Sequence, residues 1–251
     1  MENKRENPNR NFIIGRKPVW EALNSNAELS YIYICKEQLN GILLQIKISA
    51  DKAGIPVKII PLIKINNLFP KLNHQGVVAA KAFQKFYELN EVIDNSKKSK
   101  YPLLLILDSI QDPHNVGAII RTAEASGVDG ILTTIHNSAP INETVEKTSA
   151  GALSYSKICR INNVAQTIDI LKQEGFWIIG SSLQNSKKYT EIDYKIPVAV
   201  IMGNEEKGIR KLAASKCDFL INIPMKGNIQ SLNVSVATGV LLYEILRQRS
   251  L

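Results

Sequence analysis

Short apolar runs alternate with amphipathic stretches along most of this chain, and the alternation predicts an α/β protein. In the first third, β-branched runs at 31–35, 56–60 and 77–83 predict strands. Apolar residues at helical spacing predict helices at 39–53 and 62–69. These elements describe a small α/β unit.

From Tyr101 the alternation restarts with greater regularity, and its strands are apolar at consecutive positions. Strands that are apolar on both faces and joined by helices are typical of a parallel sheet covered on both sides. We therefore predict a second, larger α/β domain. Its strands are expected at 103–107, 131–134, 157–161, 176–181, 198–202 and 219–223, and its helices at 116–126, 143–150, 164–174, 209–215 and 232 to about 247.

Between these two parts the sequence becomes polar and charged (ELNEVIDNSKKSK) and loses apolar periodicity. Such a composition is typical of an interdomain linker. We therefore predict four parts along the chain. They are a flexible basic tail at 1–10, an N-terminal domain at 11–86, a linker at 87–100 and a C-terminal domain at 101–251.

Composition narrows the classes of protein that the chain can represent. Its longest apolar runs fall far short of the roughly 18 residues that span a bilayer, so we expect no membrane anchor. The first eleven residues lack the apolar core of an export signal. Cys35, Cys159 and Cys217 are widely spaced, which fits a reducing cytoplasm and not a disulfide framework. The three histidines lack zinc-ligand spacing, so we predict no metal.

The net charge of +8 and the pI near 9.3 are an unspecific indication of a polyanionic partner. Lysine and arginine gain affinity for nucleic acid by releasing phosphate counterions. In open α/β sheets, ligands bind outside the carboxyl ends of the strands. Three polar segments occupy such places in the predicted second domain: 108–121, 203–210 and 224–233.

The first segment reads LDSIQDPHNVGAIIRTAEASG. We interpret Asn115 as a helix N-cap and Gly127 as the C′ residue that ends the helix. These structural roles leave Arg121 unexplained. A guanidinium at the opening of a crevice is suited to bidentate binding of a phosphate, so we assign Arg121 a functional role.

The second and third segments carry glycine-rich turns. VAVIMGNEEKGIR is an apolar strand that ends in a Gly-x-Glu-x-x-Gly turn, and the chain contains neither a Walker nor a Gly-x-Gly-x-x-Gly motif. This argues against nucleotide hydrolysis and the usual dinucleotide fold. INIPMKGNIQSLNVSVATGVLLYE has a polar loop before Ser231, which we interpret as the N-cap of an apolar helix. Two roles are open for that loop. It either only begins the helix, or it binds an adenine or a sulfonium-bearing amino acid.

Together and in this order, the three segments resemble the signature motifs of the SpoU/TrmH family of RNA 2′-O-methyltransferases, within the SPOUT superfamily. The resemblance runs from Tyr101 onward. It rests on Asn115 and Arg121 in DPHNVGAIIR, on Glu205 in GNEEKG, and on a final set in IPMKGNIQSLNVSVA. That final set is Ser231 and Asn233.

The resemblance implies a parallel-sheet domain with a deep C-terminal trefoil knot, although threaded chains are otherwise very rare. It implies that S-adenosyl-L-methionine binds in the knotted loops, mainly through backbone groups, and that the enzyme is a homodimer whose active sites are completed by the partner subunit. It also implies a catalytic set in which Arg121 binds the phosphate beside the target ribose, Asn115 and Glu205 hold it in place, and Ser231 and Asn233 shape the substrate side. The implied cofactor-binding residues are Met202, Gly203, Ile223, Ser231 and Leu232.

The N-terminal part, with IIGRKPVWEAL and HQGVVA, resembles the L30e-like substrate-binding domain of the branch that methylates a guanosine in 23S ribosomal RNA. In that reading Arg16 and His74 touch RNA, in naked RNA or in a ribosomal precursor particle. A helix-start cation and a turn histidine are the structural alternatives. Two other functions stay open at this point, namely ribose methylation of transfer RNA and a non-catalytic role in ribosome assembly.

Overall fold

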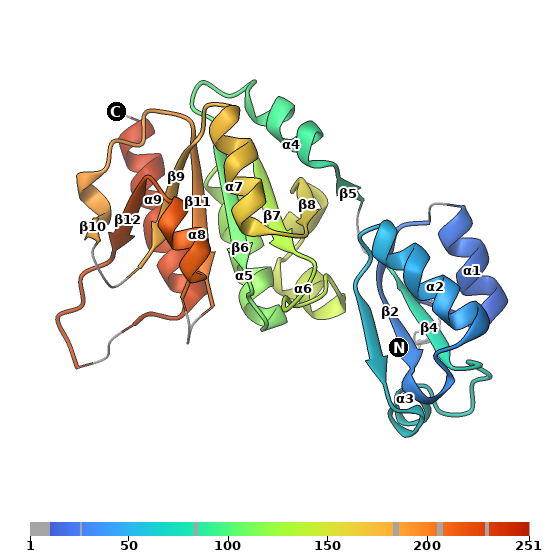
Figure 1. The fold of residues 1–251 in the computed structure, drawn as a ribbon. Coiled ribbons are helices and arrows are strands. Elements are labelled where there is room, and N and C mark those ends of the chain that lie inside the picture. Colours follow the sequence, from blue (N-terminus) through green and yellow to red (C-terminus); the bar gives the residue numbers. More distant parts are fainter. Residues whose placement is uncertain are drawn as a thin grey trace, which may run out of the picture. The chain divides into compact units, whose positions relative to one another are not determined.

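The computed structural model describes residues 11–25, 27–82, 85–182, 186–204, 208–228 and 231–250. The chain forms two compact units, Met1–Phe83 and Gln84–Leu251, and each is described by itself (Figure 1). None of the helices within the described residues is long and apolar enough to span a membrane. Glu205 lies outside the described residues, so its predicted role stays a prediction.

The first unit is a four-stranded sheet with helices on both faces. In the strand order β1-β4-β2-β3, only β2 and β3 run parallel. The first two helices cover one face through Val19, Leu43 and Ile46, and the third covers the other face through Ile65. The strands are β1 (Phe12–Ile14), β2 (Leu29–Cys35), β3 (Val57–Ile60) and β4 (Val77–Lys81), and the helices are α1 (Arg16–Asn24), α2 (Gly41–Lys52) and α3 (Leu62–Leu68).

All the elements predicted for this unit are present, but the sequence pattern missed β1 and α1. Strand β1 has three residues, which is too short for an alternating pattern to be visible. Helix α1 buries only Val19 and Ala22, and it contains Pro18 in its first turn. Proline is tolerated there because the first helical amides have no partner within the helix.

The second unit is built on an eight-stranded sheet in which every neighbouring pair of strands is parallel. The parallel sheet that the sequence predicts is thereby confirmed, whereas the trefoil knot stays a prediction. The strand order is β10 (Lys187–Lys188), β12 (Phe219–Asn222), β9 (Trp177–Ser181), β11 (Val198–Gly203), β6 (Leu103–Asp108), β7 (Gly130–Thr134), β8 (Ile158–Ile161) and β5 (Phe86–Tyr87).

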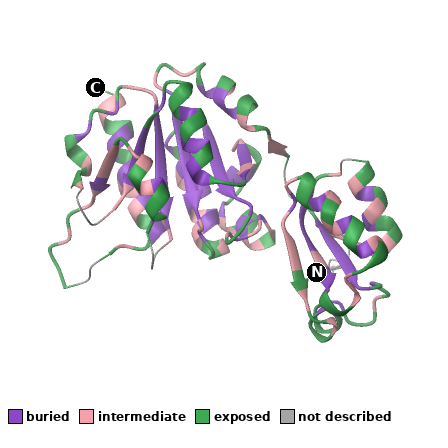
Figure 2. Cartoon of the chain, in the orientation of Figure 1, coloured by how far each residue is buried: buried purple, intermediate pink, exposed green. Residues whose placement is uncertain are grey.

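Helices cover both faces of this sheet, and its central strands β11, β6 and β7 are buried along their whole length (Figure 2). On one face α4 (Leu89–Ser96), α7 (Val164–Gln173) and α8 (Lys211–Lys216) pack on strand residues such as Leu104 and Ile106. The equally buried Leu105 points to the opposite face. That face carries the remaining helices, which are α5 (Pro113–Ala125), α6 (Glu143–Thr148) and α9 (Val234–Arg249) (Figure 1).

The predicted linker at 87–100 is wrong for most of its length, because it contains α4. Glu91 accepts a hydrogen bond from the Glu88 amide at 3.0 Å, which caps the start of this helix. Val92 and Ile93 are buried in the core of the second unit. A helix of eight residues that buries so few apolar side chains gives a pattern that polar residues dominate, and this is why it looked like a linker.

Candidate functional site

The first two of the three polar segments leave the sheet side by side. Strands β6 and β11 are parallel neighbours, and Gly203, the last residue of β11, is in register with Asp108, the last residue of β6. From β6 the chain continues to β7 on one side, whereas β9 and β12 lie on the other side of β11. The two segments therefore begin at a switch point of the sheet, which is where open α/β sheets bind their ligands.

Helix α5 begins earlier than the sequence pattern indicates. Its N-cap is Asp112, whose Oδ1 accepts a hydrogen bond from the His114 amide at 2.9 Å, and Pro113 occupies the first helical position. Asn115 therefore lies in the first turn, and its predicted role as the N-cap is wrong. Gly127 follows the helix with a φ of +78°, as expected for a C′ residue.

Arg121 lies on α5 with its side chain exposed, while its neighbours Ile119, Ile120 and Ala123 are buried. Within the described part of the chain, the structure records neither an ion pair nor a hydrogen bond for the Arg121 guanidinium. Its five donors are accordingly available to an external acceptor. A helix that is held by its buried face and carries a free guanidinium can present a rigid anion-binding fork.

The third segment reaches the first through a side-chain amide pair. Asn233 Nδ2 donates a hydrogen bond to Asn115 Oδ1 at 3.0 Å. Asn233 Oδ1 also accepts from the Ser235 amide at 2.9 Å, so Asn233 and not Ser231 is the N-cap of α9. The prediction that Ser231 is the N-cap is wrong, because α9 starts two residues later than the apolar pattern indicates. Two predicted site residues that are far apart in sequence thus meet.

A cavity of about 530 Å³ lies between the second and third segments. It is bounded by the end of β11 and the turn after it, by the end of β12, and by the loop that leads into α9. The lining is mainly apolar side chains and main chain, with few charged groups. All five residues that the sequence assigned to cofactor binding line this one cavity: Met202, Gly203, Ile223, Ser231 and Leu232.

The glycines of the second segment let the turn close on itself beside this cavity. A Cβ at Gly203 would overlap the main chain of Gly208 and Ile209. Gly208 adopts a φ of +63°, and its amide donates to the Asn204 carbonyl at 2.8 Å. The close approach of two main-chain segments therefore requires glycine at position 203, which is more than a general preference for a turn.

Sequence reasoning missed two polar contacts beside the cavity. Asp108 is buried and forms an ion pair with Arg210, in which the Oδ1–Nη2 distance is 2.7 Å. Asn204 Nδ2 donates to the Ser109 carbonyl at 3.3 Å. The sequence offered one signal for Asp108, namely an acidic residue at the end of an apolar strand, but it gave no way to find the partner.

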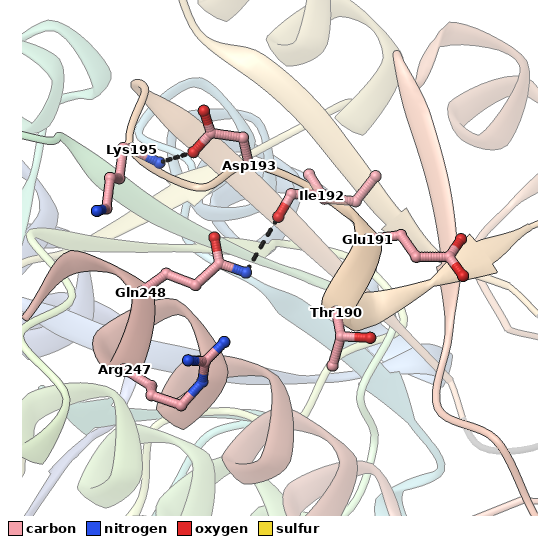
Figure 3. A pocket seen from close by; sticks show the side chains of 7 residues that line it. All are labelled: Thr190, Glu191, Ile192, Asp193, Lys195, Arg247 and Gln248. Atoms are coloured by element: carbon pink, nitrogen blue, oxygen red, sulfur yellow. Dashed lines mark hydrogen bonds between the residues drawn. The ribbon is translucent and has the colours of Figure 1, made fainter. Parts of the chain in front are cut away.

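A second hollow, of about 450 Å³, lies beside the end of α9 (Figure 3). Gln248 on α9 donates from Nε2 to the Ile192 carbonyl at 3.1 Å, and Asp193 Oδ1 accepts from the Lys195 amide at 2.9 Å. The first of these bonds fastens the segment before β11 to the helix, and the second lies within that segment. None of the predicted site residues lines this hollow, so the first cavity is the candidate site.

In the first unit, Arg16 and His74 have structural partners. Arg16 Nε donates to the Gln75 carbonyl at 2.9 Å, and its Nη2 donates to Gln38 Oε1 at 3.0 Å. His74 is buried; its Nδ1 accepts from the Gly76 amide at 3.1 Å, and its Nε2 lies 2.8 Å from Asn66 Oδ1. Burial lowers the pKa of His74, because the charged ring would lose hydration there. Because both ring nitrogens are occupied, this arrangement matches the turn histidine better than an RNA contact.

The described residues contain no cluster of three or more His, Cys, Asp or Glu side chains that suits a metal ion. The groups that the structure places at the site are the cavity lining, the guanidinium of Arg121 and the amide pair between α5 and α9. Fold and cavity together define an α/β domain that binds a small molecule at the switch point of a parallel sheet.

Comparison with known proteins identifies the family. Residues 102–243 match the model described as the SpoU rRNA Methylase family, and residues 12–87 match the model described as RNA 2'-O ribose methyltransferase substrate binding. The chain is 36% identical over 240 residues to the putative TrmH family tRNA/rRNA methyltransferase YacO of Bacillus subtilis (strain 168), covering 95% of this chain and 96% of the relative. This chain belongs to the SpoU/TrmH family of RNA methyltransferases.

Solved structures of the family share the fold. The AdoMet-bound rRNA methyltransferase from Sinorhizobium meliloti is similar with a TM-score of 0.61 and 27% identity, over 94% of this chain and 87% of that one. The TrmH/SpoU tRNA modifying enzyme of A. aeolicus is similar with a TM-score of 0.56 and 34% identity, over 64% of this chain and 82% of that one. The resemblance stated from the three segments is confirmed.

Proposed function

We propose that this enzyme transfers a methyl group from S-adenosyl-L-methionine to the ribose 2′-hydroxyl of a guanosine in 23S ribosomal RNA. The observation that carries the proposal is the convergence of the predicted cofactor residues on one cavity at the switch point of the sheet. Helix α9, whose Val234 and Ala237 line the cavity, packs against the helix that carries Arg121, and the Asn115–Asn233 bond joins the starts of these two helices. RNA methyl transfer itself follows from the family.

The cavity suits the cofactor in size and in chemistry. A volume of about 530 Å³ is within the range of small-molecule sites, and the mainly apolar lining suits an adenine ring. Gly203 lets the main chain of Gly208 and Ile209 pack directly against the end of β11, and all three residues line the cavity. We assign Met202, Gly203, Ile223, Ser231 and Leu232 to the cofactor, as the sequence motifs indicate.

When bound, S-adenosyl-L-methionine supplies an activated methyl group on its sulfonium sulfur. The chain's own residues must therefore mainly align the ribose oxygen and ease the loss of its proton. Arg121 binds the phosphate beside the target ribose and fixes its position, because its exposed guanidinium has no other described partner. Asn115 and Asn233 hold the start of α9 against α5, and Ser231 and Glu205 complete the substrate side.

Arg121 is an anchor and not the base that takes the proton. A guanidinium has a pKa above about 12 and no acceptor lone pair in its charged form. A water molecule or a phosphate oxygen of the substrate accepts the 2′-hydroxyl proton in this proposal.

The match of the first unit to a substrate-binding model supports an RNA substrate, and the description of the second unit's model as an rRNA methylase family supports ribosomal RNA. The relative from Bacillus subtilis carries a name that includes both tRNA and rRNA. We place the reaction in the cytoplasm, since Cys35, Cys159 and Cys217 are free thiols. Arg16, tethered between Gln38 and Gln75, is the residue of this unit that we assign to RNA; the bound form is naked RNA or a ribosomal precursor particle.

Mapping of the methylated ribose tests the substrate. The protein is incubated with labelled S-adenosyl-L-methionine and total RNA from cells that lack it, and the ribose methylations are then located. We expect label in 23S ribosomal RNA at a guanosine. The Arg121→Ala variant serves as the control for methylation by contaminating enzymes. Label confined to transfer RNA contradicts the ribosomal assignment.

We also propose that the enzyme is a homodimer that uses the outer face of α9. Val236 and Tyr243, two helical turns apart, expose 51% and 53% of their surface although both are large apolar side chains. Such a stripe fits a second copy of the same helix.

Light scattering tests this assembly. The expected mass is twice the 27.9 kDa of one chain, and Tyr243→Asp is expected to shift it to one chain with the fold retained by circular dichroism. Tyr155→Asp is the matched control, because Tyr155 is 79% exposed and is not part of α9. A wild-type protein that is monomeric at micromolar concentration overturns the dimer.

A further inference from the structure

The end of β6 carries a carboxylate that the proposed chemistry does not use. Asp108 is 0% exposed, which is costly for a charged group unless it is paired and hydrogen-bonded. Its partner is Arg210: Nε and Nη2 lie 2.8 Å and 2.7 Å from Asp108 Oδ1, and the Arg210 amide donates to Oδ2 at 3.2 Å. Three donors of one residue thus bind one carboxylate across 102 positions of sequence.

The pair fastens the main chain that forms the cavity wall. Gly203, Asn204, Gly208 and Ile209 line the cavity, whereas Asp108 and Arg210 do not. On the near side of the turn, Asn204 Nδ2 donates to the carbonyl of Ser109, the residue after Asp108. On the far side, Arg210 binds Asp108 itself. Both ends of the turn are therefore tied to the same corner of the sheet.

Two further features restrict the main chain at this corner of the sheet. Ser109 has a φ of +64°, a left-handed conformation that is unfavourable for a residue with a side chain. Ile209 is buried in the core and packs so closely on Gly180 that a Cβ there would press against its Cδ1. The main chain of Gly203 lies in close contact with that of Gly208 and Ile209 between these anchors.

We infer that the Asp108–Arg210 ion pair is a positioning element, which sets the part of the cavity wall formed by Gly203, Asn204, Gly208 and Ile209 and thereby the affinity of the cavity for S-adenosyl-L-methionine. The inference deepens the proposed function and rests on its assignment of the cofactor. Asp108 and Arg210 act through the glycines and touch no ligand themselves. An unclamped wall must be ordered when the ligand binds, and the free energy of that ordering is subtracted from the binding free energy.

Calorimetry of the full-length protein with S-adenosyl-L-methionine tests the inference. Arg210→Ala is expected to raise the Kd about tenfold or more, in line with the coupling of neighbouring groups. Arg210→Lys keeps the charge and loses the fork, so it should recover part of the affinity. The matched control is Lys172→Ala. It breaks another ion pair beside a strand, in which Lys172 Nζ lies 2.7 Å from Asp218 Oδ1, and neither residue lines the cavity. It should leave the Kd unchanged.

A double variant separates positioning from general stability. Arg210→Ala alone leaves a buried carboxylate unpaired, so it lowers the melting temperature and can impair folding. Asp108→Asn/Arg210→Ala removes that charge, and we expect it to regain much of the melting temperature while the Kd stays raised. A double variant that regains both overturns the inference, since stability alone would then explain the effect. So does a wild-type Kd in Arg210→Ala.

Hydrogen exchange gives a readout that needs no cofactor. The Gly208 amide donates to Asn204 and the Arg210 amide to Asp108, and both should exchange faster in the double variant than in the wild type. Unchanged protection of these two amides contradicts the clamp. A wild-type protein that binds no S-adenosyl-L-methionine overturns the proposed function instead, and the exchange rates still decide whether the ion pair holds the turn.

Discussion

Arg121→Ala is expected to lower kcat/KM for RNA methylation by about a hundredfold or more, the size of effect seen when one preorganised charge-binding donor is removed. The side chain is exposed on a helix whose other face is buried, so its removal leaves α5 in place. The melting temperature and the Kd for S-adenosyl-L-methionine should therefore match those of the wild type. A filter-binding or tritium-transfer assay measures the loss.

Two further variants make this result specific. Arg121→Lys retains a positive charge without the bidentate fork, and we expect most of the loss to persist. Glu124→Ala removes an exposed charge from the same helix and should leave activity near the wild-type level. Near-normal turnover by Arg121→Ala would falsify the assignment of Arg121 to the substrate phosphate.

Gly203→Val should abolish measurable binding of S-adenosyl-L-methionine. The Cβ alone would overlap the main chain of Gly208 and Ile209, and main chain cannot move aside as the end of a flexible side chain can. The turn must therefore shift into the cavity or away from it. Overpacking of this kind lowers the free energy of unfolding by about 1–3 kcal/mol, which urea denaturation will detect.

The control for this substitution is another glycine of the same unit. A Cβ at Gly239 on α9 would lie 3.7 Å from Thr122 Cγ2, an ordinary van der Waals contact. Gly239→Ala should consequently keep the cofactor affinity and should not lower the melting temperature. Tight binding of S-adenosyl-L-methionine by Gly203→Val would show that the ligand lies elsewhere.

The parallel sheet was predictable because its strands are apolar on both faces, as at 103–107, and few other architectures bury both faces of a strand. The three polar segments were predictable because parallel strands place their carboxyl ends at one edge. Short elements were not predicted. Helix α4 has too few apolar residues for a helical spacing to be visible among its polar residues, so the sequence pattern predicted a linker where a packed helix lies.

The errors at the helix starts have a common cause. Asn115 and Ser231 are good capping residues by type, yet Asp112 and Asn233 cap their helices. Several residues in each loop have side chains that suit a cap, and the backbone decides among them; Pro113, which fits the first helical position, favours Asp112. The Asp108–Arg210 pair was beyond sequence reasoning for another reason, because only the register of β6 with β11 brings its members together.

The Asn115–Asn233 hydrogen bond also bears on whether the two substrates bind independently of each other. The amide pair of Asn115 and Asn233 joins the helix that carries Arg121 to the loop where Leu232 lines the cavity. We therefore expect RNA binding at α5 to be coupled, through this bond, to cofactor binding in the cavity. Coupling between two binding sites is reciprocal. If bound cofactor raises the affinity of the enzyme for RNA by some factor, bound RNA raises its affinity for the cofactor by the same factor.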